Sequence, residues 1–495
     1  MPASPAAAAA AAGVSPAAPA APVMPAAPAA PAALAATGAP ATAIAAGSQA
    51  RPAPVAAAPP LAGAGVDFAL GEDQELLREQ VRRFAEERIR PGVRERDRAH
   101  RFPSEIVAEM GELGLLGMLV GEEYGGAGAD VLTYILAVEE LARVCPATAV
   151  TMSVSNSVCC WPIGRFGSEE LKRRVLPELA GGALGAFGLT EPGAGSDAGS
   201  LRTSARRDGD SWVLSGEKAW ISNAGFARWY VVVARTDPAA GKRGMTAFVV
   251  PADAPGFAVG QEEEKLGLRA SRTAPIYFND CRVPAGNVLG TPGEGFKIAL
   301  ATLDHSRVGI GAQAVGIHQR ALELAIAYAR ERVQFGVPII RHQAIRFRLA
   351  EMATALAAAR LLTWRAAVAA QSAHAAQAAD IAAADGGRSG GGGEAAAAAA
   401  GRLAAEAKVF ASEAANRAVQ ESLQIHGGNG FHDDYEISRL YRDVRVTTIY
   451  EGTSEMQRLV IARHLIGPQG KRTPEQSPTE VGAPQQRTPE RSSQG

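Results

Sequence analysis

Cysteine is scarce in this chain of 495 residues, and its net charge is close to zero. The 50 basic and 51 acidic side chains almost cancel, which argues against a protein that binds nucleic acid or anionic membranes through bulk charge. Four cysteines are too few for a disulfide framework at this length. The adjacent pair has neither a C-x-x-C spacing nor a zinc-ligand pattern, so we expect small, buried thiols in a reducing compartment and a cytoplasmic protein. The cysteines are Cys145, Cys159, Cys160 and Cys281.

The first 50 residues contain no Asp, Glu, Lys, Arg or aromatic side chain. A secretory signal or a mitochondrial presequence needs basic residues near its start, and the first basic residue is Arg51. Proline recurs every few positions, which argues against a helix that spans a membrane. We therefore expect a disordered Ala/Pro-rich head over 1–65, a disordered polar tail over 467–495 and no membrane insertion.

The remaining sequence changes its periodicity twice. Helical spacing of apolar residues predicts an α-domain over 66–184, and short β-branched runs between turn residues predict a middle β-domain of antiparallel strands over 185–290. Helical spacing returns over 291–466, interrupted by a flexible Ala/Gly-rich insertion at about 371–400. This α–β–α order does not describe a βαβ series. Helices are expected at 71–90, ended by Pro91, and at 104–115, 130–144, 147–163, 169–180, 343–370, 402–425 and 454–465, with one or two long helices after Gly295.

The segment FGLTEPGAGSDAGS is rich in glycine, yet it does not match a dinucleotide-binding fingerprint. Gly193, Gly195 and Gly199 follow a G-x-G-x-x-x-G spacing, which is one residue too long, and no βαβ unit surrounds them. The exposed amides of such a segment, with the hydroxyls of Thr190 and Ser196, suit flavin oxygens or phosphates. Taken alone, the segment is equally compatible with a glycine-rich connection between strands.

Six motifs in order make the chain similar to a known family from about residue 66 to residue 465. They are LTEPGAGSD, GEKAWISN, LGLRASRTAPIYFNDCRVP, ERVQFGVPI, QIHGGNGF and IYEGTSEMQR. With these motifs the sequence resembles the acyl-CoA dehydrogenases. The resemblance implies an α+β multidomain fold: an N-terminal helical domain, a central antiparallel β-barrel domain and a C-terminal four-helix bundle. It also implies non-covalently bound FAD and a homo-oligomer, usually a homotetramer.

The resemblance further implies which residues contact FAD. Thr190 would lie near the pyrimidine end of the flavin ring, Trp220 would cover one flavin face and Ser222 would lie near N5. Arg332 and Gln343 would reach the FAD of a neighbouring subunit, as would the segment 424–428. The complete set is Phe187, Leu189, Thr190, Gly195, Ser196, Trp220, Ile221, Ser222, Arg332, Gln343, Gln424, Ile425, His426, Gly427, Gly428, Thr453, Ser454 and Glu455. On sequence alone, Trp220 could instead be a core aromatic residue and Arg332 a solvated charge at a helix end.

The reaction that the family carries out is α,β-dehydrogenation of a saturated acyl-CoA thioester to the trans-2-enoyl-CoA. A base removes the α-proton while hydride passes from the β-carbon to flavin N5, and relatives place this base at one of two positions. One position is Glu451 in the IYEGT motif. The other is Ser306, which cannot act as a base, so Glu451 is our assignment. Ser196, Asp304, Arg307 and Gly452 match substrate-side positions, although Asp304 and Arg307 could equally form a surface ion pair.

Four alternatives to this assignment find less support in the sequence. A metal site at His426, His432, Asp433 and Asp434 has no second ligand cluster to support it, so no metal is expected. An acyl-CoA oxidase would use the same dehydrogenation but pass electrons to oxygen. A monooxygenase on this fold would have no use for the IYEGT glutamate, and a non-catalytic protein would have little reason to keep every motif. The motifs favour a short- or medium-chain acyl substrate, with electron-transferring flavoprotein as the acceptor and a role in fatty acid β-oxidation.

Overall fold

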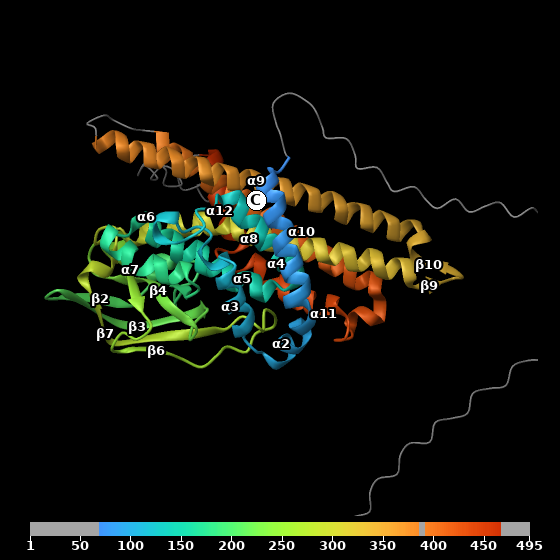
Figure 1. The fold of residues 1–495 in the computed structure, drawn as a ribbon, viewed down its shortest axis with the longest axis horizontal. Coiled ribbons are helices and arrows are strands. Elements are labelled where there is room, and N and C mark those ends of the chain that lie inside the picture. The colour runs from blue at the N-terminus through green and yellow to red at the C-terminus, as the bar shows by residue number, and fades with distance from the viewer. Residues whose placement is uncertain (1–68, 386–391, 467–495) are drawn as a thin grey trace, which may run out of the picture. The chain divides into compact units, whose positions relative to one another are not determined.

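The computed structural model describes residues 69–385 and 392–466. The head predicted over 1–65 and the tail predicted over 467–495 lie outside these ranges. The described chain passes through a helical region, a β-sheet and a second helical region (Figure 1). The predicted fold class, with helical N-terminal and C-terminal domains on either side of a β-domain, is confirmed.

Capped, apolar-faced helices form the first region. Asp130 and Ser168 act as N-caps, because their side chains accept hydrogen bonds from the backbone N–H groups of Thr133 and Leu171. Two π-helical turns, η1 (Ala85–Ile89) and η5 (Ser155–Cys160), interrupt the regular helices. The α-helices are α1 (Glu72–Phe84), α2 (Val93–Ala99), α3 (Ser104–Glu112), α4 (Val131–Val144), α5 (Pro146–Val154), α6 (Trp161–Phe166) and α7 (Glu169–Ala180).

Pro91 does not end the first helical stretch, as the sequence analysis expected. It lies in a short 3-10 turn, Arg90–Gly92, from which α2 continues to Ala99. A proline in the first turn of a helical segment costs little, because its missing N–H would have no intrahelical acceptor there.

The middle region is a sheet in which the strand order is β6-β7-β3-β2-β4-β5-β8, with β1 paired to β4. Most pairs are antiparallel, as predicted, but β4 pairs in parallel with β1 and, at one position, with β2. These two pairs correct the expectation of a wholly antiparallel sheet; β2 and β3 lie in the connection that lets β1 and β4 run in the same direction. The strands are β1 (Leu184–Gly188), β2 (Ser204–Asp208), β3 (Ser211–Ser222), β4 (Ala227–Arg235), β5 (Met245–Pro251), β6 (Phe257–Val259), β7 (Thr273–Pro284) and β8 (Val288–Leu289).

Long helices dominate the last region. Helix α8 packs against α4 of the first region and against α9 and α10, and a side chain at Gly316 would collide with the backbone oxygen of Glu139 on α4. Glycine therefore allows these two helices to approach closely. The elements are α8 (Gly295–Glu331), the hairpin strands β9 (Val333–Gln334) and β10 (Val337–Pro338), α9 (Gln343–Asp385), α10 (Gly392–His426), α11 (Glu436–Val444) and α12 (Ser454–Ile466).

The segment expected to be a flexible insertion at about 371–400 is largely helical. Helix α9 continues through Asp385 and α10 begins at Gly392, while residues 386–391 lie outside the described chain. Alanine has the highest helix propensity of all residues, so the Ala-rich sequence on both sides of the glycine cluster extends two packed helices. Gln371 contacts α4 by accepting a hydrogen bond from Val131 N, which shows that the extension packs on the first region.

Candidate functional site

Glu451 lies on a sharp turn just before α12. Its backbone is left-handed, with φ of 52°, and Gly452 follows with φ of 92°. The carboxyl atom Oε2 is shielded from solvent and has no hydrogen-bond partner within residues 69–385 and 392–466. Burial raises the pKa of this carboxyl, while the Ser306 hydroxyl, Lys408 and Arg307 act in the opposite direction. Glu451 is therefore a carboxylate held in a strained, largely dry position, which is typical of a functional base.

Helix α8 brings the predicted substrate-side pair to this turn. Asp304 and Arg307 form an ion pair one turn apart, but the Arg307 side chain is buried and is not part of a solvated surface. The Arg307 Nε atom also donates to the backbone oxygen of Glu451, at 3.3 Å. Burial raises the pKa of Asp304, and Arg307 partly offsets this rise. The structure thus brings Asp304 and Arg307 together with Glu451.

Two further residues contact this turn, and the sequence analysis missed both. The buried Lys408 on α10 donates from Nζ to the Gly452 oxygen at 2.7 Å. Gln457 on α12 donates from Nε2 to the Gly452 oxygen at 2.8 Å and to the Glu451 oxygen at 3.2 Å. A single lysine in an Ala-rich helix has no local sequence signal. Only the helical register, which places Lys408 on a wholly buried face, could have singled it out.

The segment that begins with β1 presents exposed backbone beside the sheet. Gly195 and Ser196 are exposed, Thr190 and Phe187 are half-buried, and Leu189 is buried. Ala219 N on β3 donates to Thr190 O at 2.9 Å. This bond ties the glycine-rich segment to the strand that carries Trp220.

A buried ion pair between Glu191 and Lys218 holds the start of the same glycine-rich segment. Glu191 accepts hydrogen bonds from Lys218 Nζ at 2.7 Å, Arg202 N at 2.6 Å and Thr203 N at 2.9 Å. Burial lowers the pKa of Lys218 to about 8, with Glu191 opposing the shift. Both residues belong to motifs quoted above, LTEPGAGSD and GEKAWISN, yet the sequence analysis gave neither a role.

Trp220 projects from an irregularity in β3. The pairing of β3 with β7 shifts register between Lys218 and Ile221, and Trp220 has a positive φ of 62°. Its side chain is 60% exposed, so it is not a core aromatic residue within the described part of the chain. Ile221 is buried, and Ser222 lies at the end of the strand opposite Thr273. A bulky residue with positive φ is costly, and such positions are typical of functional sites.

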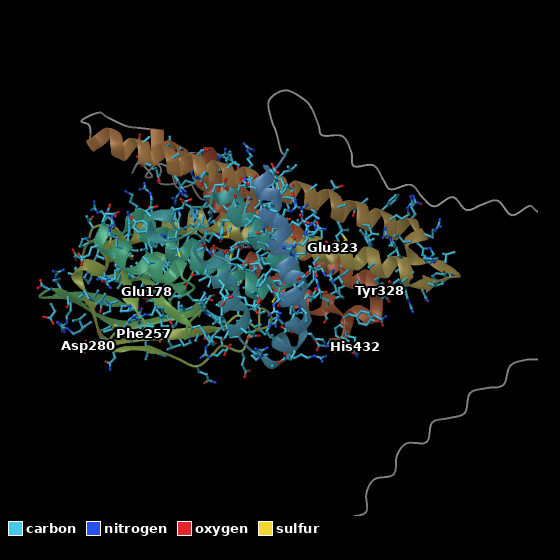
Figure 2. The ribbon with its side chains drawn as sticks, viewed as in Figure 1. Glu178, Phe257, Asp280, Glu323, Tyr328 and His432 are labelled. Carbon is cyan, nitrogen blue, oxygen red and sulfur yellow. The ribbon has the colours of Figure 1, made fainter. Side chains whose placement is uncertain are left out.

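A second group of predicted residues lies at the far end of the long helices. Tyr328 near the end of α8 stacks on His426 at the end of α10, with ring centroids 4.3 Å apart. Figure 2 shows Tyr328 and His432 at this end, and Glu178, Phe257 and Asp280 on the side of the sheet. Arg332, Gln343, Gln424, Gly427 and Gly428 are exposed here, whereas Ile425 and His426 are buried.

These two groups do not meet within one chain. Arg307 and Arg332 mark their positions along α8, and they lie roughly 38 Å apart at ~1.5 Å of helix rise per residue. The side chain of Phe335 in the β9–β10 turn is 94% exposed and has a positive φ of 53°. The far group is therefore an exposed surface with a strained aromatic residue at its edge.

The remaining predicted residues lie at the start of α12. Ser454 is buried, and its hydroxyl has no partner in the described chain. Glu455 is exposed, and hydrogen bonds from its own backbone and from Thr453 lower its pKa. Thr453 is half-buried. All three residues directly follow the Glu451–Gly452 turn.

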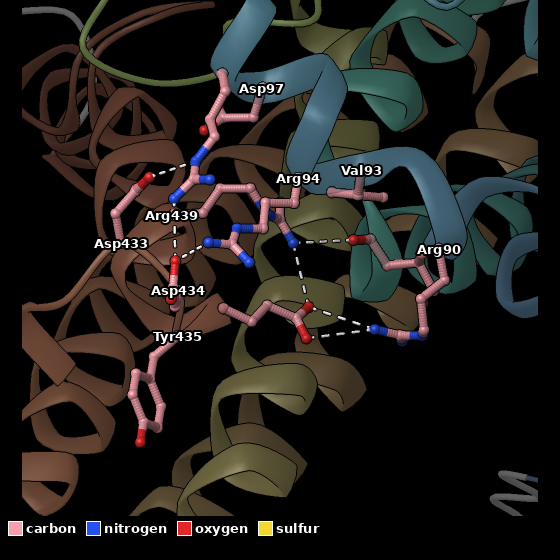
Figure 3. Close-up of a pocket in the computed structure, with 11 residues that line it drawn as sticks. Arg90, Val93, Arg94, Asp97, Asp433, Asp434, Tyr435 and Arg439 are labelled. Carbon is pink, nitrogen blue, oxygen red and sulfur yellow. Dashed lines mark hydrogen bonds and ion pairs between the residues drawn. The ribbon is translucent and has the colours of Figure 1, made fainter. Parts of the chain in front are cut away.

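The acidic residues that resembled metal ligands are engaged in ion pairs. Asp433 accepts from Arg98 Nε at 2.7 Å, and Asp434 pairs with Arg94. They line a charged pocket between α2 and α11 (Figure 3), and its lining, as far as the chain is described, includes none of the residues predicted above to bind FAD or substrate. His426 contacts Ser422 O through Nδ1, at 2.7 Å, and does not belong to this lining.

In residues 69–385 and 392–466, no helix is long and apolar enough to cross a bilayer. All four cysteines are buried, as predicted, and they are free of disulfides within the described residues.

Three domain families match consecutive parts of the sequence. "Acyl-CoA dehydrogenase, N-terminal domain" matches residues 71–183, "Acyl-CoA dehydrogenase, middle domain" matches 186–281 and "Acyl-CoA dehydrogenase, C-terminal domain" matches 293–466. The sequence is 48% identical over 398 residues to the mitochondrial short-chain specific acyl-CoA dehydrogenase of Bos taurus, covering 80% of this chain and 91% of the relative.

Solved structures with the same fold extend this likeness. Butyryl-CoA dehydrogenase from Megasphaera elsdenii is 41% identical with a TM-score of 0.74, covering 81% of this chain and all of that one. A chain in a structure of the electron transferring flavoprotein of Acidaminococcus fermentans is 42% identical with a TM-score of 0.74 and the same coverage. A glutaryl-CoA dehydrogenase from Mycobacterium smegmatis in complex with FADH2 is 33% identical with a TM-score of 0.70, covering 81% and 97%.

Proposed function

Because this chain belongs to the acyl-CoA dehydrogenase family, we propose that it oxidises a short-chain acyl-CoA, with Glu451 as the base that removes the α-proton. The enzyme is an FAD-dependent oxidoreductase that converts a saturated acyl-CoA thioester into the 2-enoyl-CoA. The observation that carries the assignment of the base is the Oε2 of Glu451 on a strained turn, which is shielded from solvent and has no hydrogen-bond partner among the described residues.

The residues present fit a bound flavin. Exposed backbone at Gly195 and Ser196 offers hydrogen-bond donors, and the exposed Trp220 indole offers an aromatic face. We assign Phe187, Leu189, Thr190, Gly195, Ser196, Trp220, Ile221, Ser222, Thr453, Ser454 and Glu455 to the FAD of their own chain. When bound, FAD supplies the oxidant, which accepts a hydride from the acyl β-carbon.

The protein's own residues supply the proton acceptor and its surroundings. An α-C–H bond next to a thioester is a weak acid, so the base must have a raised pKa and be kept from water. Burial does both at Glu451, since it raises the pKa of the carboxyl and shields Oε2. Gly452, whose φ of 92° forms the turn beside the base, is assigned to the substrate side. We place Asp304, Arg307 and Ser196 on the substrate side as well.

A short, unbranched acyl chain is the proposed substrate. Supporting this choice are the relatives at 48% and 41% identity, which are described as short-chain specific and as acting on butyryl-CoA. Anaerobic titration with acyl-CoAs of increasing length, followed by flavin absorbance, tests it. Maximal bleaching of the flavin is expected with an acyl chain of about four to six carbons. A preference for long acyl chains would contradict the proposal.

We further propose the partners and the setting of this reaction. The similar chain in the structure of an electron transferring flavoprotein supports that protein as electron acceptor, and hence a role in fatty acid β-oxidation. The exposed group around Arg332 supports a homo-oligomer, a tetramer, in which Arg332, Gln343 and the segment Gln424, Ile425, His426, Gly427 and Gly428 contact the FAD of a neighbouring copy. Four free, buried thiols support a reducing compartment such as the cytoplasm.

Substitution of Glu451 by Gln tests the base directly. The variant keeps the size of the side chain but cannot accept a proton, so it is expected to purify with FAD, bind acyl-CoA and lose ~10²–10⁴-fold or more in the rate of anaerobic flavin reduction. Glu264→Gln, at an exposed position on a loop, is the matched control and should reduce flavin at the wild-type rate. Near wild-type bleaching by the Glu451 variant would refute the assignment. Rapid reoxidation of the wild-type enzyme by oxygen would instead identify an oxidase.

A further inference from the structure

The turn that carries Glu451 is held by side chains from three different helices. Arg307 on α8 donates to the Glu451 oxygen, Lys408 on α10 donates to the Gly452 oxygen, and Gln457 on α12 donates to both. These donors converge on two consecutive backbone carbonyls. In an ordinary loop such carbonyls would be solvated, so this arrangement replaces water with fixed side chains.

The backbone of this turn needs such support. Glu451 has φ of 52° and Gly452 has φ of 92°, and the left-handed region is unfavourable for a non-glycine residue, because Cβ approaches the backbone carbonyl oxygen. A relaxed backbone at Glu451 would swing the carboxyl away from its present position, because the side chain follows the Cα–Cβ bond. The hydrogen bonds on both carbonyls therefore determine where the carboxyl points.

Lys408 is the unusual member of this set. Its side chain is 0% exposed, and in the described chain its recorded hydrogen bond is the one to Gly452, at 2.7 Å. Burying an ammonium group is expensive unless carboxylates or hydrogen bonds compensate for the lost water. Burial lowers the pKa of Lys408 to about 8, and Glu451 is the acid that most opposes this shift. An apolar residue would fill this buried position without the cost of burying a charge. We therefore expect the charge of Lys408 to have a function.

We propose that Lys408 is a positioning residue for the reaction: its ammonium group holds the Gly452 carbonyl and so sets the Glu451 turn, and its positive charge favours the ionised form of the base. Through the hydrogen bond to Gly452, Lys408 fixes where the carboxylate lies, and through its charge it sets the pH at which the carboxylate is available. This inference rests on the proposed role of Glu451.

Other groups also face the base and limit what Lys408 can contribute. Arg307 adds a second positive charge, and the Ser306 hydroxyl favours the carboxylate form of Glu451. Glu413 and Glu455 face Lys408 and favour its charged form. Tyr134 on α4 and Tyr450, next to the base in sequence, also interact electrostatically with Glu451, and Asp304 on α8 pairs with Arg307. Because Arg307 also contacts this turn, removal of Lys408 should change the pKa of the base while one guanidinium group remains beside it.

Two variants separate the hydrogen bond from the charge. Lys408→Met removes both, while Lys408→Gln keeps an N–H donor without the charge. For the methionine variant we expect a roughly 10- to 100-fold lower rate of anaerobic flavin reduction and an acid limb that moves up by about one pH unit. For the glutamine variant we expect part of the rate to return while the acid limb stays shifted. KM should change less than kcat in both variants, because neither removes a substrate contact.

Lys297→Met, at an exposed position on α8, is the matched control, and both its rate and its acid limb should equal those of the wild type. FAD content and Tm report folding; if Lys408→Met does not fold, the glutamine variant decides alone. A folded, yellow variant with the wild-type rate and the wild-type acid limb would overturn the inference. Failure of the base assignment gives a different result, since Glu451→Gln would then bleach normally.

Discussion

Glu451 combines two properties that rarely occur together in a carboxyl group. It is enclosed enough for its pKa to rise, and its backbone adopts a conformation that favours glycine or asparagine. Each property costs stability, and neither helps the chain to fold. Both are explained if the position of the carboxylate matters more for the reaction than its contribution to stability.

The raised pKa predicts how the rate depends on pH. Glu451 accepts a proton only when ionised, so the rate of anaerobic flavin reduction should rise with pH through a pKa above the usual range of a glutamate. Stopped-flow measurements of flavin bleaching between pH 5 and 9, a range of about four units around the expected limb, test this. A rate that is independent of pH down to the ordinary glutamate pKa would contradict the burial argument.

The same raised pKa predicts that the contribution of Glu451 to stability falls as pH rises, whereas the rate of flavin reduction increases. A carboxyl whose pKa is higher in the folded state stabilises that state below its unfolded pKa, and this contribution is lost as pH rises through the folded pKa. Glutamine mimics the protonated form at every pH. The Tm of Glu451→Gln minus that of the wild type should therefore grow as pH is raised, as measured by thermal unfolding. A difference that shrinks with rising pH would mean that the pKa is lowered instead.

At the scale of elements, the segment after β1 and the strand β3 form one unit. The Glu191–Lys218 ion pair and the bond from Ala219 to Thr190 join them, and Trp220 follows directly along β3. A shift of β3 would therefore move Trp220 and the exposed amides together. This is a simple way for two distant motifs to keep a constant separation.

Breaking the buried pair should uncouple these motifs. Lys218→Met leaves the Glu191 carboxylate without its main partner, which typically costs roughly 3–5 kcal/mol when a buried pair is broken. We expect a lower Tm and loss of FAD during gel filtration. The double variant Lys218→Met/Glu191→Gln should recover part of the stability, because no unpaired charge remains. Equal Tm values for the single variant and the wild type would show that the pair contributes nothing.

Local sequence signals predicted most helices but not every boundary. Helix α7 begins and ends as expected, because Ser168 caps it and its apolar spacing is regular. Helix α11 was missed, since its nine residues include charged side chains whose partners lie on distant helices, such as Arg320 for Glu436 and Asp97 for Arg442. The parallel pairing of β1 with β4 was missed because no local pattern encodes which distant strand is a neighbour. Because of the glycine cluster, the non-helical segment between α9 and α10 was predicted to be longer than it is, at about 371–400.

The residues of the candidate site also fall into two kinds, those that sequence motifs identify and those that only tertiary packing identifies. Glu451, Trp220 and the glycine-rich segment belong to motifs that can be read along the chain. Lys408 and Gln457 become meaningful only when α10 and α12 pack against the turn. Contacts that depend on three helices meeting at one point have no signature in any single stretch of sequence.

At the scale of the whole molecule, the proposed FAD contacts lie at two ends of a long helical region. The near group surrounds Glu451 and Trp220, and the far group surrounds Arg332 and the strained Phe335. A cofactor that touched both groups within one chain would have to span roughly 38 Å, the distance set by the rise of α8. Two copies of the chain, related by symmetry, remove this difficulty.

Substitution of Arg332 tests this arrangement. Arg332→Ala removes a guanidinium that would bind a phosphate across the boundary between copies, so FAD retention and oligomer stability should fall together. Arg330→Ala, exposed on the last turn of α8, is the matched control and should change neither. FAD absorbance and sedimentation velocity, measured on the same samples, give the two quantities. Loss of FAD with an intact oligomer, or the reverse, would mean that Arg332 does not link them.

Helix α8 is an uninterrupted rod of 37 residues that carries Arg307 near one proposed group and leads to Arg332 at the other. In such a rod, deletion of one residue between them would rotate every later side chain by about 100° and shorten the span by ~1.5 Å. A small local shift of α8 cannot compensate for this rotation or this shortening, because Gly316 is already packed tightly against α4. The length of α8 is thus as restricted as the identity of its side chains, and only sequence changes that preserve the number of residues keep both ends in phase.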